Sequence, residues 1–134
     1  ILARLGVIGT TLEQIEAVFP AALQERQTAL QERVAALCGD VEIDEARMVQ
    51  ELAIMADKSD VTEELVRAKS HIKQFRQWFD TSEPVGRKLD FLLQEINREV
   101  NTIGSKSSDS EIALSVVAVK NELEKIREQI QNVM

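Results

Sequence analysis

The amino-acid sequence predicts an all-α fold, a bundle of about five helices. Apolar residues recur at helical spacing in five segments, and no segment shows the strict alternation typical of a strand. Only 5 of the 134 residues are Gly and 2 are Pro, too few for the tight turns of a β-sandwich. The chain is 44% hydrophobic and 29% charged, which is typical of one folded domain rather than a disordered segment.

The first two helices are predicted over residues 11–37 and 44–57. Pro20 either kinks the first helix or starts a new first turn, and Gly39 suits a left-handed cap after it. Asp44 is expected to cap the second helix. The apolar positions of the first helix are Leu12, Ile15, Phe19, Leu23, Leu30, Val34 and Leu37. Those of the second are Met48, Leu52 and Met55 or Ala56.

The third and fourth helices are predicted over residues 61–79 and 84–104. Asp60 and Glu63 have the spacing of a capping box before the third helix, and Pro84 suits the first turn of the fourth. The apolar stripe of the third helix consists of Val61, Leu65, Ala68, Ile72, Phe75 and Phe79. That of the fourth consists of Leu89, Leu92 or Leu93, Ile96, Val100 and Ile103.

The fifth helix is predicted over residues 109–134, after a loop at 104–108. Ser108 and Glu111 have the spacing of a capping box. Its apolar residues alternate in steps of four and three over about three heptads, as in a coiled-coil seam. They are Ile112, Val116, Val119, Leu123, Ile126, Ile130 and Val133. These patterns together predict long antiparallel helices, bundled or paired, ending in a heptad-patterned helix.

The charge and cysteine content exclude several classes of protein. The formal net charge is −7, which argues against a protein that coats nucleic acid through charge alone. A single Cys and a single His exclude an internal disulfide and a Cys/His zinc site, and they indicate a reducing compartment, so we expect a cytoplasmic protein. No apolar run approaches the ~20 residues of a membrane span, so we expect no membrane association.

The charge is unevenly distributed along the chain. Residues 1–60 contain 5 basic and 11 acidic residues, whereas residues 67–88 contain 6 basic and 2 acidic residues. A basic stretch of this kind is either a solvated helix face or a surface that binds phosphates. Both readings remain open from the sequence alone.

Polar residues flank both sides of the apolar stripe on the fourth helix, according to a helical wheel. One row, rich in amides, consists of Asp90, Gln94, Asn97 and Asn101. The other row, rich in carboxylates, consists of Glu95, Glu99, Thr102 and Lys106. A solvated surface is one interpretation, but Asn is a poor helix former, so helix propensity does not explain the amide row.

The only histidine, His71, lies beside the apolar stripe of the third helix, seven residues after Glu64 and four after Arg67. It is either a half-buried boundary residue or an acid/base group or metal ligand, since its ordinary pKa is near physiological pH. Glu64 and His71 lie about 10.5 Å apart along the axis, so a shared ion would need a ligand from another helix. Two aromatic residues off the stripes, Trp78 and Phe91, favour self-association.

Several reaction classes lack their motifs. The scattered glycines form neither a dinucleotide-binding nor a Walker A pattern, and no G-x-S-x-G elbow is present. A di-iron bundle needs Glu-x-x-His on two helices, whereas the only His has Ala68 three residues before it.

Residues 85–106, VGRKLDFLLQEINREVNTIGSK, resemble the YicC family of bacterial proteins, whose phrase is close to GRRLDFLxQExNREANTxxSK. The family phrase has Arg where this chain has Lys88, and Ala or Ser where it has Val100. Residues 60–71 and 126–133 resemble the family as well. The resemblance covers residues 44–134 and weakens before them.

The resemblance implies a stress-induced endoribonuclease that depends on a divalent metal, Mn or Mg, and assembles into a hexameric ring. Family members are about twice as long as this chain and have an N-terminal domain with strands. We therefore expect residues 1–43 to be a remnant of that N-terminal half or a linker, and residues 44–134 to be the C-terminal helical domain. The start at Ile1 rather than Met fits a piece of a longer protein.

RNA cleavage needs a group that activates the nucleophile, stabilisation of the charged phosphorane, and a proton for the leaving oxygen. The family pattern contains polar residues suited to these tasks, and their roles here are inferred from their chemistry. The catalytic candidates are His71, Glu95 and Glu99. The metal-ligand candidates are Glu64, Asp90, Glu95 and Glu99, whose hard oxygens suit Mg²⁺ or Mn²⁺. The RNA-binding candidates are Arg67, Arg87, Lys88, Asn97, Arg98, Asn101 and Lys106.

Two functions are therefore open. The first is a metal-dependent endoribonuclease acting on loops or single strands of RNA, as a homo-oligomer. The alternative is a non-catalytic oligomerisation or adaptor module, in which the C-terminal seam and the off-stripe aromatic residues are the functional surfaces.

Overall fold

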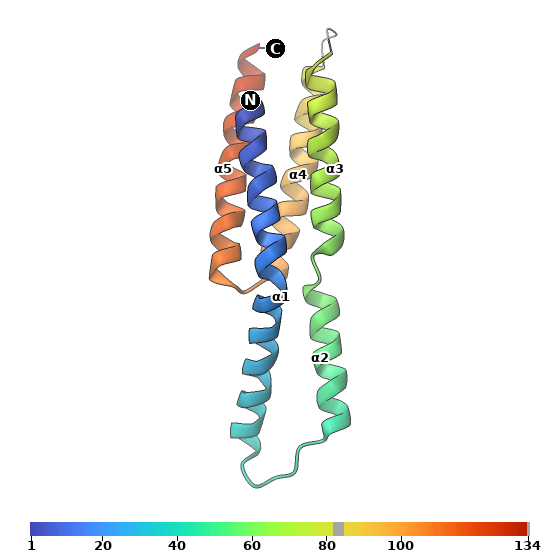
Figure 1. The fold of residues 1–134 in the computed structure, drawn as a ribbon, viewed down its shortest axis with the longest axis vertical. Helices are drawn as coiled ribbons and strands as arrows, with labels where there is room; N and C mark the ends of the chain where they lie inside the picture. The colour runs from blue at the N-terminus through green and yellow to red at the C-terminus, as the bar shows by residue number, and fades with distance from the viewer. Residues whose placement is uncertain (82–84, 134) are drawn as a thin grey trace.

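The computed structural model describes residues 1–81 and 85–133 of the chain. Within these residues it contains five helices and no strand (Figure 1), which confirms the all-α prediction. The helices are α1 (Leu2–Cys38), α2 (Glu45–Ser59), α3 (Thr62–Phe79), α4 (Gly86–Lys106) and α5 (Ser110–Val133). The predicted first-turn role of Pro84 and the seam position of the Val133 side chain lie outside what the structure describes.

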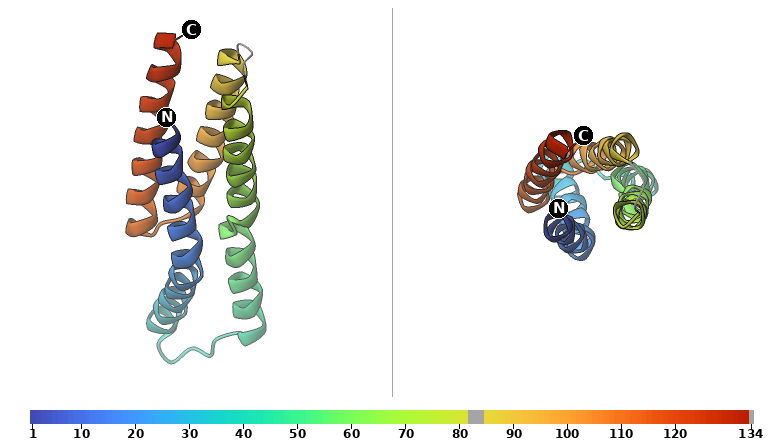
Figure 2. Two further views of the ribbon diagram at one scale, coloured as in Figure 1. Left: turned by 45° about the horizontal axis from the view of Figure 1, so that its top comes forward. Right: turned by 90° about the horizontal axis from the view of Figure 1, so that it is seen from above.

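The N-terminal part of α1 packs with α3, α4 and α5 into a four-helix body. Viewed from above, α5 and α3 flank α4, and α1 lies across the bundle from it (Figure 2). Neighbouring helices around this body run antiparallel. The α3 stripe is buried from Val61 to Phe75, and both Leu92 and Leu93 of α4 are buried. The α5 seam is buried from Ile112 to Ile130, as its heptad pattern predicts.

Helix α1 begins nine residues earlier than predicted, at Leu2 rather than residue 11. Leu5 and Ile8 are fully buried and continue the stripe of Leu12 and Ile15 towards the N-terminus. Burial of each such side chain contributes roughly 1.5–3 kcal/mol, which is enough to extend the helix although residues 6 and 9 are glycines.

The C-terminal half of α1 and the whole of α2 extend beyond the body as a two-helix arm (Figure 1). Ser59, at the end of α2, is the only buried residue of that helix, and its predicted apolar face is only half-buried. Leu37 continues the helical spacing of the apolar residues of α1 but is not buried, since it is 80% exposed. A pair of helices forms a single layer, so neither helix of the arm has a second surface to close over its apolar side.

Two of the predicted helix ends are confirmed. Asp44 caps α2, since its Oδ1 accepts a hydrogen bond of 3.1 Å from the backbone N–H of Arg47. Gly39 has a φ of 55° after the last turn of α1, and its N–H donates to the carbonyl of Ala35. A side chain at Gly39 would meet the left-handed penalty that glycine avoids.

Both predicted capping boxes are wrong. Asp60 accepts instead from the hydroxyl and the backbone N–H of Thr62, at 2.6 and 2.9 Å, and these bonds lower the pKa of its carboxyl. Glu63 pairs with Arg67 rather than with the backbone. Before α5 the capping group is Asp109, not Ser108, because α4 continues to Lys106 and shortens the predicted loop.

None of the helices in the described ranges is both long enough and apolar enough to cross a lipid bilayer.

Helix α4 packs closely against α5 at Gly104, so replacing this glycine should stabilise the protein less than replacing a glycine with open space around it. A Cβ atom at Gly104 would lie 3.3 Å from Cγ1 of Val116, whereas one at Gly9 would meet nothing within 4 Å. Gly9→Ala should raise the free energy of unfolding by about 1 kcal/mol. Gly104→Ala should gain less, because Val116 must move to admit the methyl group.

Chemical denaturation of both variants, alone and with Val116→Ala, measures this difference. The gain from Gly104→Ala should increase in the Val116→Ala background. An equal gain at both glycines in the native background would contradict the close approach of α4 and α5.

Candidate functional site

The two polar rows of α4 face different neighbouring helices. In the carboxylate row, Glu99 and Lys106 pair with residues of α3. In the amide row, Asp90 lies 3.7 Å from Nε of Arg127 on α5. The rows therefore border two separate grooves, on opposite sides of α4.

The contacts between α3 and α4 follow one antiparallel register. Arg67 pairs with Glu99, the ammonium of Lys88 lies 5.6 Å from the Trp78 ring centre, and Lys106 donates to the carbonyl of Asp60 at 3.1 Å. From one pair to the next, the residue number rises on one helix by as much as it falls on the other, as expected for antiparallel helices.

This register places His71 and Glu95 at the same level of the α3–α4 groove. His71 lies one turn after Arg67 on α3, and Glu95 lies one turn before Glu99 on α4. The Nδ1 atom of His71 is buried and has no hydrogen-bond partner among the described residues. The Glu95 side chain is 21% exposed, with its Oε1 3.7 Å from Arg98. Both residues are half-buried, and neither is held in a short ion pair.

Two carboxylates of the groove are buried. Glu64 is 4% exposed and Glu99 is 7% exposed. Burying a carboxylate without a cation costs several kcal/mol, and here Lys106 and Arg67 supply the cations. Lys106 Nζ donates to Glu64 at 2.7 Å, and Arg67 Nε donates to Glu99 at 3.0 Å.

Arg67 links the two ion pairs, since its Nη2 lies 3.9 Å from Glu64. Its hydrogen bond to Glu99 raises the pKa of its guanidinium. One oxygen of Glu64, Oε2, is buried without a hydrogen-bond partner among the described residues. We call the six predicted residues gathered here the α3–α4 polar row: Glu64, Arg67, His71, Glu95, Glu99 and Lys106.

The remaining predicted residues do not join this row. Asp90 accepts from Gln94 at 3.0 Å and faces α5. Asn97 lines a separate pocket of about 320 Å³ between α4 and α5, and Asn101 is exposed. Arg98, paired with Glu95, borders the row from the exposed side. Arg87 and Lys88 are exposed near the start of α4, where Lys88 lies over Trp78.

Sequence reasoning missed Lys120 and Arg127 of α5, which line the Asn97 pocket. Arg127 lies within the 126–133 stretch that resembles the family, so its position offered a signal. Lys120 offered none, because the pattern of α5 does not show which neighbour its polar face borders.

The predicted metal ligands do not form a metal site within one chain. Across residues 1–81 and 85–133, no three His, Cys, Asp or Glu side chains are grouped so that they could hold a metal ion. Asp90 lies in a different groove from Glu64 and Glu99, and both of the latter already pair with cationic side chains. A single chain therefore offers no grouping of three such ligands in its described residues, and metal dependence stays a prediction.

A double-mutant cycle tests the burial of the Glu64–Lys106 pair. Combining Glu64→Gln with Lys106→Met should give a coupling energy of about 1–2 kcal/mol in urea denaturation, because Glu64 lies in a low-dielectric interface. The exposed pair of Glu124 and Arg127, whose side chains are 60% and 47% exposed, should give about 0.5 kcal/mol or less. Equal coupling in the two cycles would show that Glu64 is solvated.

Comparison with known proteins agrees with the resemblance seen in residues 85–106. The family model "Endoribonuclease YicC-like, C-terminal" matches residues 15–134, and thus begins earlier than the predicted limit at residue 44. A protein from Clostridioides difficile named "Probable endoribonuclease YicC" is 50% identical over 134 residues, covering 99% of this chain and 46% of that protein. Its namesake from Haemophilus influenzae is 39% identical over 129 residues, covering 96% of this chain and 44% of that protein.

The chain therefore spans less than half the length of these relatives. Because the family model covers most of its residues, the chain belongs to the YicC-like endoribonuclease family and corresponds to the C-terminal domain of that family.

Proposed function

We propose that this chain is the RNA-cleaving domain of an endoribonuclease and that RNA binds along the α3–α4 polar row. The observation that carries the proposal is the shared level of His71 and Glu95, with cations on both sides of them in the same groove. Arg67 and Lys106 lie towards one end, and Lys88 lies towards the other. Both relatives are named probable endoribonucleases, which supports the same reaction class.

In this proposal, His71 and Glu95 move the protons of the cleavage. One of them accepts the proton of the attacking hydroxyl, either a water or a ribose 2′-hydroxyl, as the new P–O bond forms. The other donates a proton to the departing 5′-oxygen as its bond to phosphorus breaks. Imidazole suits either task, since its ordinary pKa is about 6.5.

The cations of the row stabilise the negative charge that develops on the phosphate oxygens. Glu99 and Glu64 act as positioning residues in this reading. Their buried carboxylates hold Arg67 and Lys106 at the edge of the groove, and both cations keep N–H groups for a phosphate. Glu99, which we predicted to be catalytic, thus supports the reaction through Arg67.

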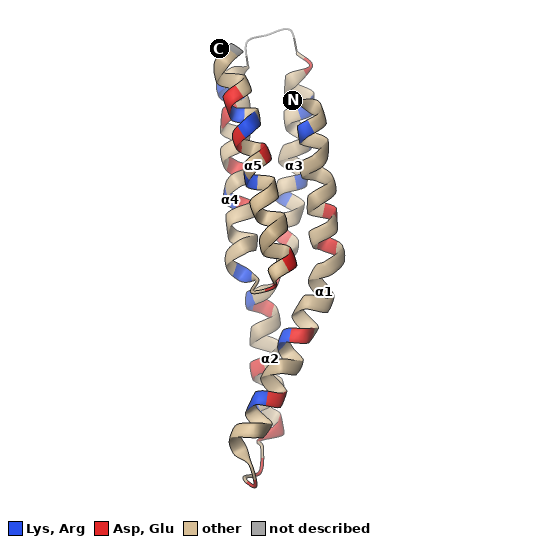
Figure 3. Ribbon diagram, turned by 90° about the vertical axis from the view of Figure 1, so that its left-hand side faces the viewer, with Lys and Arg blue, Asp and Glu red and all other residues tan. Residues whose placement is uncertain are grey.

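The distribution of charge supports local contact with RNA rather than coating of a long duplex. Along the ribbons of α1, α2 and α5 in Figure 3, acidic residues are interspersed with the basic ones. Phe91 is 55% exposed on α4, and an exposed aromatic ring can stack on an unpaired base. These features favour loops or single strands as the substrate.

We also propose dependence on Mn²⁺ or Mg²⁺ and assembly into a homo-oligomer, hexameric by the family resemblance. A cation at the polar row would need donors from the RNA phosphate or from another subunit, because one chain supplies too few. The exposed apolar side chains of the arm, among them Leu37, Val41 and Val49, support self-association. The same observation favours the alternative function, a non-catalytic oligomerisation module.

Cleavage of a hairpin RNA in the presence of Mn²⁺ tests the catalytic assignment. His71→Ala and Glu95→Gln should each lower the cleavage rate by about 10²–10⁴-fold, and chelation of the metal should abolish cleavage. Glu13→Gln is the matched control, because Glu13 is an exposed carboxylate of α1 outside the row. The control should cleave at the rate of the unmodified chain.

Two results would contradict the proposal. Unchanged rates in both the His71 and Glu95 variants would remove these residues from the reaction. Absence of cleavage in the unmodified chain, together with a scattering mass that shows a metal-independent oligomer, would favour the oligomerisation module.

A further inference from the structure

A cluster of donors lies where the arm joins the four-helix body. We call it the waist cluster and define it as Arg26, Lys58, Ser59, Lys106 and Ser107. It borders two pockets of about 400 and 440 Å³. Both pockets are lined by Arg26, Ser59 and Lys106, so these residues form a wall between them.

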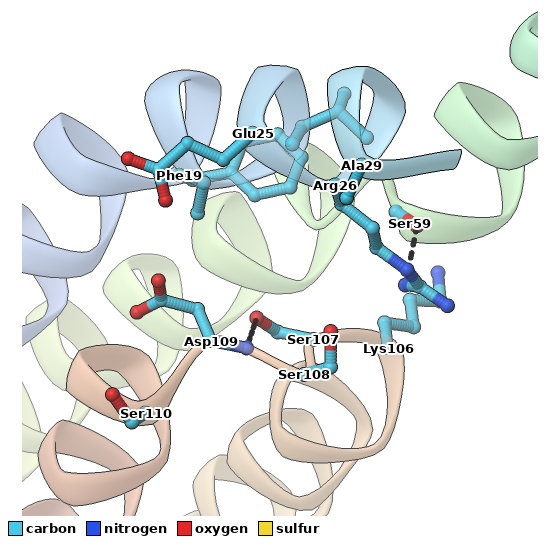
Figure 4. Close-up of a pocket in the computed structure, with 12 residues that line it drawn as sticks. Phe19, Glu25, Arg26, Ala29, Ser59, Lys106, Ser107, Ser108, Asp109 and Ser110 are labelled. Carbon is cyan, nitrogen blue, oxygen red and sulfur yellow. Dashed lines mark hydrogen bonds between the residues drawn. The ribbon is translucent and has the colours of Figure 1, made fainter. Parts of the chain in front are cut away.

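Two cationic groups are held side by side in this wall. Arg26 Nη1 donates to the hydroxyl of Ser59 at 3.3 Å, and Lys106 Nζ donates to the carbonyl of Asp60 at 3.1 Å. Because Ser59 and Asp60 are adjacent in the chain, both cations are fixed to the same turn. Figure 4 shows the Arg26 and Lys106 head groups at one end of the first pocket.

The carboxylates near the cluster neutralise Lys106 but not Arg26 or Lys58. Glu25 and Asp109 line the first pocket but lie at its other end in Figure 4. Among the described residues, Arg26 and Lys58 form no ion pair, and Lys106 pairs only with Glu64. Glu51 is the one carboxylate residue lining the second pocket, against three cations.

The cluster also has more hydrogen-bond donors than acceptors. Arg26 uses one of its five N–H groups. Ser59 is only 5% exposed and accepts from Arg26, while no described residue accepts its own proton. The hydroxyl of Ser107 likewise accepts, from the backbone N–H of Asp109 at 3.2 Å, and keeps its proton for another group.

We propose that the waist cluster binds a phosphate group through Arg26, Lys58 and the hydroxyls of Ser59 and Ser107. A phosphate offers several acceptor oxygens in different directions, and these donors come from α1, α2 and the α4–α5 turn. The pocket on each side of the wall has the size of a small-molecule site. Each pocket is thus large enough for a nucleoside next to the phosphate.

We take the RNA strand as the source of that phosphate, which rests on the proposed function. Lys106 belongs both to the waist cluster and to the α3–α4 polar row, so the two sites are continuous. A strand bound along the row would reach the waist at Lys106. Its phosphate there would connect the arm to the body, since Arg26 and Lys58 lie in the arm.

Binding of inorganic phosphate tests the site without RNA. Isothermal titration at constant ionic strength compares the unmodified chain with Arg26→Gln/Lys58→Gln. The double variant should weaken phosphate binding by about tenfold or more, because charge-assisted hydrogen bonds are lost. The matched control is Arg33→Gln/Lys125→Gln, which removes two exposed cations outside both pockets and should bind phosphate as the unmodified chain does. Circular dichroism checks that each variant is folded.

Binding of a short single-stranded RNA without terminal phosphates tests the source of the phosphate. The slope of log K against log salt should fall in magnitude by about 1.4 in Arg26→Gln/Lys58→Gln, about 0.7 for each cation removed. If the double variant loses phosphate binding but binds RNA as before, the site binds a free phosphate or a mononucleotide. That result would overturn RNA as the source of the phosphate.

Other outcomes separate this proposal from the proposed function. No phosphate binding by the unmodified chain, or equal loss in the control variant, would overturn the waist site. Phosphate binding that depends on Arg26 and Lys58, in a chain whose cleavage does not depend on His71 and Glu95, would support the waist site while the catalytic assignment fails.

Discussion

The packing of α3 against α4 must accommodate two buried carboxylates, and the arrangement of the candidate site follows from this constraint. Glu64 and Glu99 are nearly inaccessible to solvent, so each requires a cation in the same interface. Arg67 and Lys106 meet that need, and in doing so they fix the antiparallel register of the two helices. The register in turn brings His71 to the level of Glu95, although neither residue takes part in the ion pairs of Glu64 and Glu99.

The molecule divides into a body with a continuous core and an arm without one. Four helices bury the side chains that stabilise the body, whereas the arm has two helices and no second layer. The donors of the waist cluster lie at the junction of these parts. A phosphate bound there would connect the two parts through charge rather than through apolar packing.

The periodicity of the sequence correctly predicted most of the buried face of each body helix. It did less well at helix ends, where single hydrogen bonds decide the outcome. Asp109 caps α5 in place of the predicted Ser108 because α4 continues past Gly104 to Lys106. Leu37 has the right spacing for burial but is exposed, because burial also requires a neighbouring surface that the arm lacks.

The sequence by itself determined the helical class, the apolar stripes and the family, since helical period and the phrase at residues 85–106 are local properties of the chain. It also placed a polar row on each side of the α4 stripe. Only the tertiary structure decided that the carboxylate row meets α3 and the amide row meets α5. The physical reason is that a helical wheel gives directions within one helix, whereas the partner of each direction depends on how distant segments pack. For the same reason, Arg26, Lys58 and Lys106 meet only in the folded chain.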